Sequence, residues 1–303
     1  MINKIKSFVR KHRFLRRILY VFHFKLFFYN LLYRHKAIRN IPFKYQLPDG
    51  DFISLYPQGQ IAKSLFIGGF ECEEIKLFFS FLKPGMHIID VGANIGIYSI
   101  VAEKKLRGDG KIWSFEPAKN TYKMFIRNLA INKAKNVIMY NVGLGDGTSK
   151  KAVLRQDIGY GDGEKYIIPN NTAPDYNLPN VNQIMEKEEI SLVTIDAIIQ
   201  RAGNPKIDFI KIDTEGFEYF ILLGAENVIK SNPNIIILME CTRLGNTRAG
   251  VTQDSVFSLI REKYGLNIFY WDSAQGTWSN NTKSAKKAGN VWVCKDIDQL
   301  PIL

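Results

Sequence analysis

Acidic residues stand at or directly after the ends of four short apolar runs in this 303-residue chain. Asp90 follows His-Ile-Ile, Glu116 follows Ile-Trp-Ser-Phe, Asp213 follows Phe-Ile-Lys-Ile, and Glu240 follows Ile-Ile-Leu-Met. Runs of this kind predict buried strands, and parallel strands bring their carboxyl ends to one edge of a sheet. Carboxylates gathered at such an edge can bind amines and hydroxyls, or accept a proton during a reaction.

The stretch 87–99 predicts a strand that turns directly into a helix. Small or conformationally tolerant residues form the turn, and they let a ligand approach the main chain: Gly92, Ala93, Asn94 and Gly96. Such a turn, at the carboxyl end of a parallel strand, is the usual seat of a nucleotide-like ligand. The NAD fingerprint G-x-G-x-x-G is not matched, because Asn94 and Ile97 occupy the positions of its second and third glycines.

Two acids, Asp90 just before this turn and Glu116 at the end of the next strand, favour S-adenosylmethionine over a dinucleotide as the ligand. A carboxylate at Asp90 would repel a pyrophosphate but suits a ligand with an amine and a sulfonium. Glu116, followed by Pro117, ends the second strand about two dozen residues on, where an acid can accept the hydroxyls of a ribose. Alone, Asp90 could equally cap the turn. The pair predicts a bound S-adenosylmethionine.

The segment after the strand 207–212 offers the best catalytic candidates. As the fourth strand, its tip would lie beside the first, so Asp213 or Glu215 could orient or deprotonate a hydroxyl near the transferred methyl group. The alternative is that one or both cap the next helix. Glu240, at the tip of the fifth strand, could face the same cleft. These three acids could bind Mg²⁺ or Mn²⁺, but we predict no metal because capping and acid–base roles account for them.

Alternating strands and helices continue along most of the chain. Asn141 and Asp146 follow the third strand and could border the adenine, although ordinary turn chemistry explains them equally well. A long polar loop over about 156–190 is assigned to acceptor binding. Helices are predicted over 71–82, 97–106, 119–132, 195–202, 218–230 and 253–264, and a terminal strand pair over 266–271 and 290–295, with Trp278 in the loop between them.

Taken together, these motifs resemble the FkbM family of S-adenosylmethionine-dependent methyltransferases over roughly residues 70–245. They are Asp90-Val-Gly-Ala-Asn-Ile-Gly96, Phe115-Glu-Pro117, Asn141-Val-Gly-Leu-Gly-Asp146, Lys211-Ile-Asp-Thr-Glu-Gly-Phe-Glu218 and Met239-Glu240. The resemblance implies an α/β, Rossmann-like class I methyltransferase with helices on both faces of a seven-stranded, mostly parallel sheet whose last pair is antiparallel. It implies cofactor contacts at Asp90, Gly92, Asn94, Gly96 and Glu116, to which we add Ala93, Tyr98 and Pro117. It also implies active-site roles for Asp213 and Glu215, and methylation of hydroxyl oxygens, often on sugars, glycans or polyketides.

The net charge of +12 is concentrated in one segment. Residues 1–40 hold 11 of the 41 Lys and Arg residues and none of the 29 acids, which leaves the rest of the chain nearly neutral. This segment is rich in Phe, Leu and Tyr, but its apolar run is too short for a spanning helix and no signal-peptide cleavage site follows. It predicts a peripheral contact with an anionic membrane, or a helix that packs on the body. Nucleic acid is the least favoured partner, since no basic patch recurs in the rest of the chain.

These observations give a basic N-terminal segment (1–40), a hairpin and helix module (41–84) and a cofactor-binding domain (85–303). Three cysteines without metal or disulfide spacing favour a reducing, cytoplasmic setting, with possible peripheral attachment at the inner face of a membrane. The predicted activity is O-methylation of a sugar in a glycan or glycolipid precursor. The alternatives are a small-molecule, polyketide-like O-methyltransferase, a non-catalytic membrane-associated scaffold, and an NAD-dependent oxidoreductase.

Overall fold

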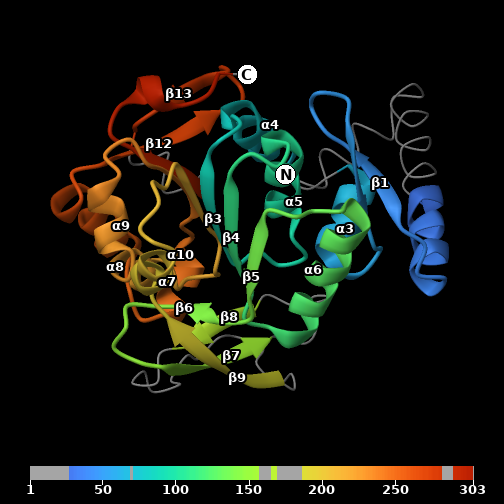
Figure 1. Cartoon of the computed structure of the whole chain (residues 1–303), viewed down its shortest axis with the longest axis horizontal. Coiled ribbons are helices and arrows are strands. Elements are labelled where there is room, and N and C mark those ends of the chain that lie inside the picture. Colours follow the sequence, from blue (N-terminus) through green and yellow to red (C-terminus); the bar gives the residue numbers. More distant parts are fainter. Residues whose placement is uncertain (1–26, 69–70, 157–164, 169–185, 282–288, 303) are drawn as a thin grey trace, which may run out of the picture.

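A computed structural model describes residues 27–68, 71–156, 165–168, 186–281 and 289–302, and its centre is an eight-stranded sheet (Figure 1). The strand order is β13-β12-β14-β11-β10-β3-β4-β5. In chain order these strands are β3 His87–Val91, β4 Lys111–Phe115, β5 Val137–Tyr140, β10 Phe209–Ile212, β11 Ile236–Glu240, β12 Asn267–Asp272, β13 Thr277–Ser279 and β14 Asn290–Cys294.

The order of the strands places a topological switch point between β3 and β10. Strands β4 and β5 continue from β3 on one side, and β10 and β11 lie on the other, all parallel to β3. Ligands of open α/β sheets bind outside the carboxyl ends of the strands at such a point. The antiparallel pair β12 and β14 completes the predicted seven strands, and the class I arrangement is confirmed.

One strand, β13, was not predicted. It pairs antiparallel with β12 at the edge of the sheet, where Trp271 lies opposite Trp278. The two indole rings are 5.1 Å apart, and Trp278 Nε1 donates a hydrogen bond to the carbonyl of Pro301 (2.7 Å). This aromatic pairing and hydrogen bond turn the predicted loop around Trp278 into an eighth strand.

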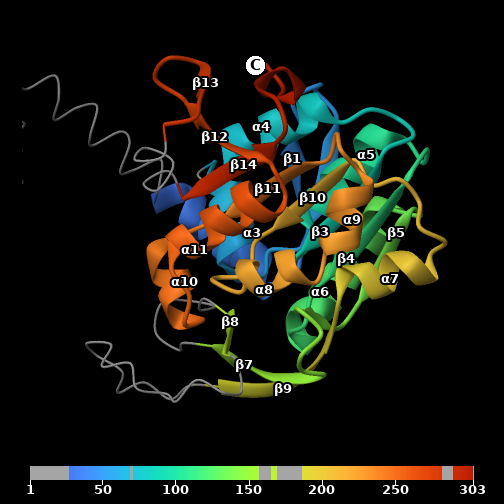
Figure 2. The same ribbon diagram turned by 90° about the vertical axis from the view of Figure 1, so that its left-hand side faces the viewer.

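Helices cover both faces of the sheet, as the two views show (Figures 1 and 2). One face packs on α4 Cys72–Phe81, α5 Ile97–Leu106 and α6 Lys119–Asn132. The other packs on α7 Ile195–Arg201, α8 Glu218–Leu223, α9 Glu226–Ser231 and α11 Gln253–Ser258. Because side chains alternate along a strand, Ile88 belongs to the first core and Ile89 to the second.

Two predicted helices are each divided. The helix expected over 218–230 is split into α8 and α9 at Gly224, where a Cβ would lie 2.0 Å from the carbonyl oxygen of Gly145. The helix expected over 253–264 continues from α11 as a π-helix, Leu259–Lys263. The structure adds α3 Gly59–Ile67, α10 Arg243–Arg248 and a 3₁₀-helix, Ile297–Gln299, none of which was predicted.

A second sheet replaces part of the long loop predicted over 156–190. Its order is β6-β9-β7-β8, with β6 Gly143–Leu144, β7 Lys151–Gln156, β8 Lys165–Ile168 and β9 Glu186–Val193. Apolar side chains at alternate positions, including Ala152, Leu154, Ile190 and Leu192, are buried. The prediction of a loop was therefore wrong for β8 and for residues 186–190 of β9, and its segments 157–164 and 169–185 lie outside the described residues.

The N-terminal part of the described chain packs on α6. The predicted hairpin forms β1 Phe43–Gln46 and β2 Phe52–Leu55. The side chain of Asn132 accepts from the N–H of Ser54 (2.8 Å) and donates to the same residue's carbonyl. Asn128, buried on α6, accepts from the N–H of Tyr56 (3.0 Å) and donates to the carbonyl of Ile95 (2.9 Å). Its amide therefore joins the hairpin to the turn after β3.

Candidate active site

The turn after β3 touches the end of β10 through the backbone. Gly92 has a φ of +73°, and a Cβ on it would lie 1.8 Å from the carbonyl oxygen of Asp213. Only glycine fits both the backbone angle and the space. Gly96 (φ +91°) begins α5 against the ring of Phe125, where a Cβ would lie 2.1 Å from ring carbons. The predicted tight turn is confirmed, with Ala93 buried inside it.

Glu116, directly after β4, binds this turn. Its Oε2 accepts a hydrogen bond from the N–H of Asn94 (3.0 Å) and its Oε1 from the N–H of Ala118 (2.9 Å). The Asn141 amide donates to the carbonyls of Glu116 and Pro117, both at 2.9 Å, so it fixes this corner. Burial raises the pKa of Glu116 to about 7, against these hydrogen bonds. A carboxylate offers about four acceptor positions, so both oxygens can still accept the hydroxyls of a ribose.

Asp90 is buried inside the protein and not exposed at the surface of the turn. It is within β3 and 1% exposed, and Ser99 Oγ donates to its Oδ2 (2.5 Å) while lying 2.7 Å from Ser114 Oγ. Among the described residues its Oδ1 has no hydrogen-bond partner. Burial raises the pKa of Asp90, partly offset by Lys211. A buried acceptor without a donor is costly, so Oδ1 is the atom through which a ligand amine would fit; the contact itself stays a prediction.

A buried lysine, which the sequence analysis did not select, is the cation of the site. Lys211 Nζ lies 2.9 Å from Asp213 Oδ2 and 4.5 Å from the ring centroid of Tyr98. Tyr98 is buried, and its hydroxyl donates to Glu71 Oε2 (2.7 Å) at the start of α4. Burial alone would lower the pKa of Lys211, but Asp213, Asp90 and Glu71 together raise it above its usual value. A lysine inside an apolar strand needs such partners. Its position within Phe-Ile-Lys-Ile could therefore have indicated a role in the site.

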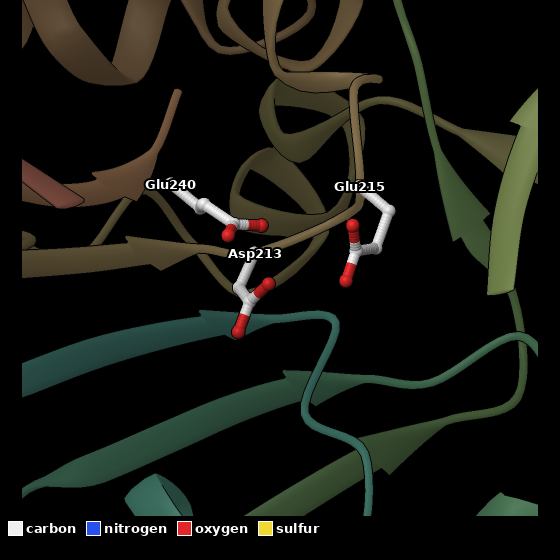
Figure 3. A group of neighbouring side chains, drawn as sticks. All are labelled: Asp213, Glu215 and Glu240. Atoms are coloured by element: carbon white, nitrogen blue, oxygen red, sulfur yellow. The ribbon is translucent and has the colours of Figure 1, made fainter. Parts of the chain in front are cut away.

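Three carboxylates meet at the tips of β10 and β11, where Asp213, Glu215 and Glu240 turn toward one another (Figure 3). One oxygen from each lies within 4.8 Å of the others. Burial, followed by the neighbouring Asp213 and Glu215, raises the pKa of Glu240 to about 9, while Lys211 opposes the rise. Like charges this close do not all ionise at neutral pH. The site therefore combines Asp213, held by Lys211, with a protonated Glu240.

The same three oxygens could share a divalent cation, since carboxylates suit Mg²⁺ and Mn²⁺. Acidic groups also gather in proteins without a metal. The geometry alone therefore assigns no ion to this site.

Glu218 organises the loop between β10 and α8. Its Oε1 accepts from the N–H groups of Thr214 and Gly216 (both 3.1 Å) and from the Thr214 hydroxyl (3.0 Å). Glu218 is 1% exposed, and burial raises its pKa against these hydrogen bonds. Glu218 thus holds the loop before α8, a role that the sequence analysis did not assign, while the N-cap of this helix, Phe217, makes no side-chain cap hydrogen bond.

The residues beside the third strand are less involved. Asp146 Oδ1 accepts from the N–H (3.0 Å) and hydroxyl (2.8 Å) of Thr148, an ordinary turn, so its contact with adenine stays a prediction. A hollow of about 280 Å³ opens beside the turn after Glu116, between α6 and the second sheet. It is lined by Ala118, Lys119, Asn120, Leu154, Arg155, Lys165, Lys187 and Glu188.

The strand order, with its switch point between β3 and β10, is that of the class I, Rossmann-like methyltransferase fold. The sequence pattern described as the methyltransferase FkbM domain matches residues 90–265. The chain belongs to the FkbM methyltransferase family, and it is an enzyme whose methyl donor is S-adenosylmethionine.

Curated relatives share about a quarter of their residues with the chain. Methyltransferase sdnD of Sordaria araneosa is 26% identical over 223 residues, which are 63% of this chain and 78% of that protein. Methyltransferase 1 of Beauveria bassiana is 25% identical over 174 residues, 55% of this chain and 67% of that protein. The AMB antimetabolite synthetase AmbE of Pseudomonas aeruginosa is 25% identical over 211 residues, 62% of this chain but 10% of that protein.

Solved methyltransferases show a more distant likeness. Precorrin-6y C5,15-methyltransferase from Geobacter metallireducens is 14% identical with a TM-score of 0.39, covering 75% of this chain and 87% of that one. A SAM-dependent methyltransferase from Aquifex aeolicus is 15% identical with a TM-score of 0.37, covering 74% and 88%.

Proposed function

We propose that this enzyme transfers a methyl group to a hydroxyl oxygen of a sugar, in a glycan or a glycolipid precursor. The observation that carries the proposal is the set of Asp213, Glu215 and Glu240 at two neighbouring strand tips, next to the turn at Gly92. Carboxylates at this position suit an acceptor that is rich in hydroxyl groups, because they accept hydrogen bonds and protons from them.

Asp213 is the base in this proposal. S-adenosylmethionine supplies a methyl group on a sulfonium, which is already a good leaving group. As the acceptor oxygen bonds to the methyl carbon and the carbon–sulfur bond breaks, the hydroxyl proton passes to Asp213. Lys211, 2.9 Å from Asp213 Oδ2, fixes the orientation of that carboxylate. Alignment of the hydroxyl with the methyl group then supplies much of the acceleration.

Glu240 has a different role from Asp213 in this proposal. Since its pKa is raised to about 9, it is protonated at neutral pH and can donate a hydrogen bond. A protonated carboxyl next to a second carboxyl group resembles the division of roles in other two-acid sites. A sugar offers a second hydroxyl oxygen that can accept the hydrogen bond while the first is methylated.

The hollow beside Glu116 also supports a polar acceptor. Six of its eight lining residues are charged or carry an amide side chain, and only Ala118 and Leu154 are apolar. Apolar small molecules prefer enclosed, mostly apolar pockets. An open, polar hollow suits an extended, hydroxylated acceptor better.

A small-molecule O-methyltransferase is the second candidate. The likeness to the antimetabolite synthetase AmbE favours it. The non-catalytic scaffold and the NAD-dependent oxidoreductase have no comparable support, since the chain belongs to a methyltransferase family.

The test uses the full chain with methyl-labelled S-adenosylmethionine. Glycan and lipid-linked oligosaccharide fractions from the source organism are compared with a panel of polyketides and amino-acid derivatives. We expect label on a sugar oxygen, located by methylation analysis. Label on the small molecules only, or on nitrogen or carbon, would contradict the proposal.

Two variants check the assignment of the base. Asp213→Asn is expected to keep its affinity for S-adenosylhomocysteine, measured by calorimetry, while transfer falls by about 10²–10⁴-fold. The exposed Asp298→Asn is the control and should transfer normally. A near-normal rate for Asp213→Asn would move the base to Glu215.

A further inference from the structure

The helix formed by residues 27–38 lies at the outer edge of the molecule (blue in Figure 1) and has two unlike sides. One side packs on the body. Tyr33 is 7% exposed, its hydroxyl donates to the carbonyl of Gly59 (3.0 Å), and its ring lies 5.6 Å from that of Phe66. Tyr29 meets the same ring edge-on at 6.0 Å. The helix is therefore held on α3 by its tyrosines.

The opposite side presents large apolar side chains to solvent. Phe27, Phe28, Leu31 and Leu32 are 67%, 51%, 55% and 38% exposed. Their spacing places them together on one side of a helix, and we call them the apolar face. Single exposed apolar residues are common, but four adjacent ones mark a binding surface.

The charge around the apolar face indicates what covers it. Arg34, Lys36 and Arg39 follow it directly, and residues 1–26 contain eight Lys and Arg residues without one acid. A partner must therefore offer an anionic surface above an apolar interior, which is the structure of a bilayer with acidic lipids. A second copy of the same segment would be repelled by its like charge.

We propose that the apolar face docks the enzyme on an anionic membrane surface, with Arg34, Lys36 and Arg39 against the lipid headgroups. Within the described part of the chain, no helix is long and apolar enough to cross a membrane. The helix would lie in the interface, its tyrosine side still on α3. This attachment does not depend on which acceptor the enzyme methylates.

The test is sedimentation of the full chain with vesicles. One set contains phosphatidylcholine alone, and the other also contains phosphatidylserine. We expect strong binding to the second set, weak binding to the first, and release at high salt. The double variant Phe28→Glu/Leu31→Glu should bind at least ten times more weakly. The control Ile297→Glu/Ile302→Glu adds the same charge at two exposed apolar positions elsewhere and should bind like the unmodified chain.

Each other outcome overturns the proposal. Equal, weak binding to both vesicle sets would exclude a membrane partner, and full binding by Phe28→Glu/Leu31→Glu would exclude the apolar face. A dimer in light scattering that this variant dissociates would assign the face to a second copy. Unchanged affinity for S-adenosylhomocysteine in the variants shows that the fold is intact, and keeps this result separate from the identity of the acceptor.

Discussion

Lys211 and Asp213 lie two residues apart at the end of β10, and Nζ of the first is 2.9 Å from Oδ2 of the second. Their side chains differ in exposure, 7% for Lys211 and 32% for Asp213. The cation is thus buried while the anion remains accessible from the site. Two further carboxylates lie near the same ammonium: the buried Asp90, which is paired with Lys211 in the strand register, and the half-buried Glu71.

Removing this ammonium should destabilise the protein in a pH-dependent way. Lys211→Met is expected to lower the free energy of unfolding by about 3–5 kcal/mol at pH 8, because Asp90, Asp213 and Glu71 lose their buried counter-charge. The loss should be smaller at pH 5, since the pKa values of Asp90 and Glu71 are already raised by burial and these groups then take up protons. Urea unfolding at both pH values measures it. Lys211→Arg keeps the charge and should lose less; an equal loss at both pH values would contradict the electrostatic explanation.

Binding of the cofactor product should depend on pH through Glu116. With a pKa of about 7, this group is mostly protonated at pH 6 and mostly ionised at pH 8. Ribose hydroxyls donate to the ionised form, so the affinity for S-adenosylhomocysteine should fall by about tenfold from pH 8 to pH 6. Calorimetry at both pH values checks this. Glu116→Gln should bind weakly with little pH dependence, whereas a steep dependence in that variant would place the titrating group elsewhere.

Because the pKa of Glu240 is raised, the protein should become less stable as the pH rises. Its pKa is about 9 in the folded protein, against 4.5 for an unperturbed glutamate, so between these values the folded state holds the extra proton. The free energy of unfolding then falls with increasing pH across this window. Glu240→Gln removes the titrating group and should be more stable than the unmodified protein by roughly 1–3 kcal/mol at pH 9. The difference should shrink toward pH 5, and thermal melts across the series would show it.

The contact between Gly92 and Asp213 should tolerate no added atom. Gly92→Ala places a Cβ 1.8 Å from a backbone oxygen at a φ of +73°, so we expect a melting temperature lower by many degrees and loss of cofactor binding. Gly50→Ala is the matched control, because Gly50 has a similar φ of +89° but nothing within 4 Å of the added Cβ. It should cost only about 1–2 kcal/mol of backbone strain. Similar losses of stability in the two variants would mean that backbone strain, and not the contact with the Asp213 carbonyl, causes the loss in Gly92→Ala.

The sequence predicted those parts of the fold that follow from local patterns. The run His87–Val91 and the small residues after it indicate a strand and a turn without knowledge of any neighbour. Lys211 is different, since its partners Asp90 and Glu71 lie more than a hundred residues earlier in the chain. Its proximity to Asp90 follows only from the pairing of β3 with β10.

The second sheet is another part of the fold that local sequence patterns do not predict. Strand β9 depends on its pairing with β7, in which Ala152 lies opposite Ile190. The intervening polar residues hide that pairing, so the sequence indicates a loop. The role of Glu218 was not predicted either, because its donors in Thr214 and Gly216 surround it only once the loop before α8 is folded.

The side chain of Asn128 limits how the protein can be shortened. Its amide oxygen accepts a hydrogen bond from the N–H of Tyr56, and its amide nitrogen donates one to the carbonyl of Ile95. A fragment of residues 90–265, the part matched by the family, lacks Tyr56 and would leave this buried amide oxygen without its donor. It would also expose the apolar undersides of α5 and α6, which are otherwise covered by the hairpin and α4. The smallest piece able to fold alone must therefore begin before the hairpin, and a search for a compact catalytic core should start its truncations upstream of Phe43.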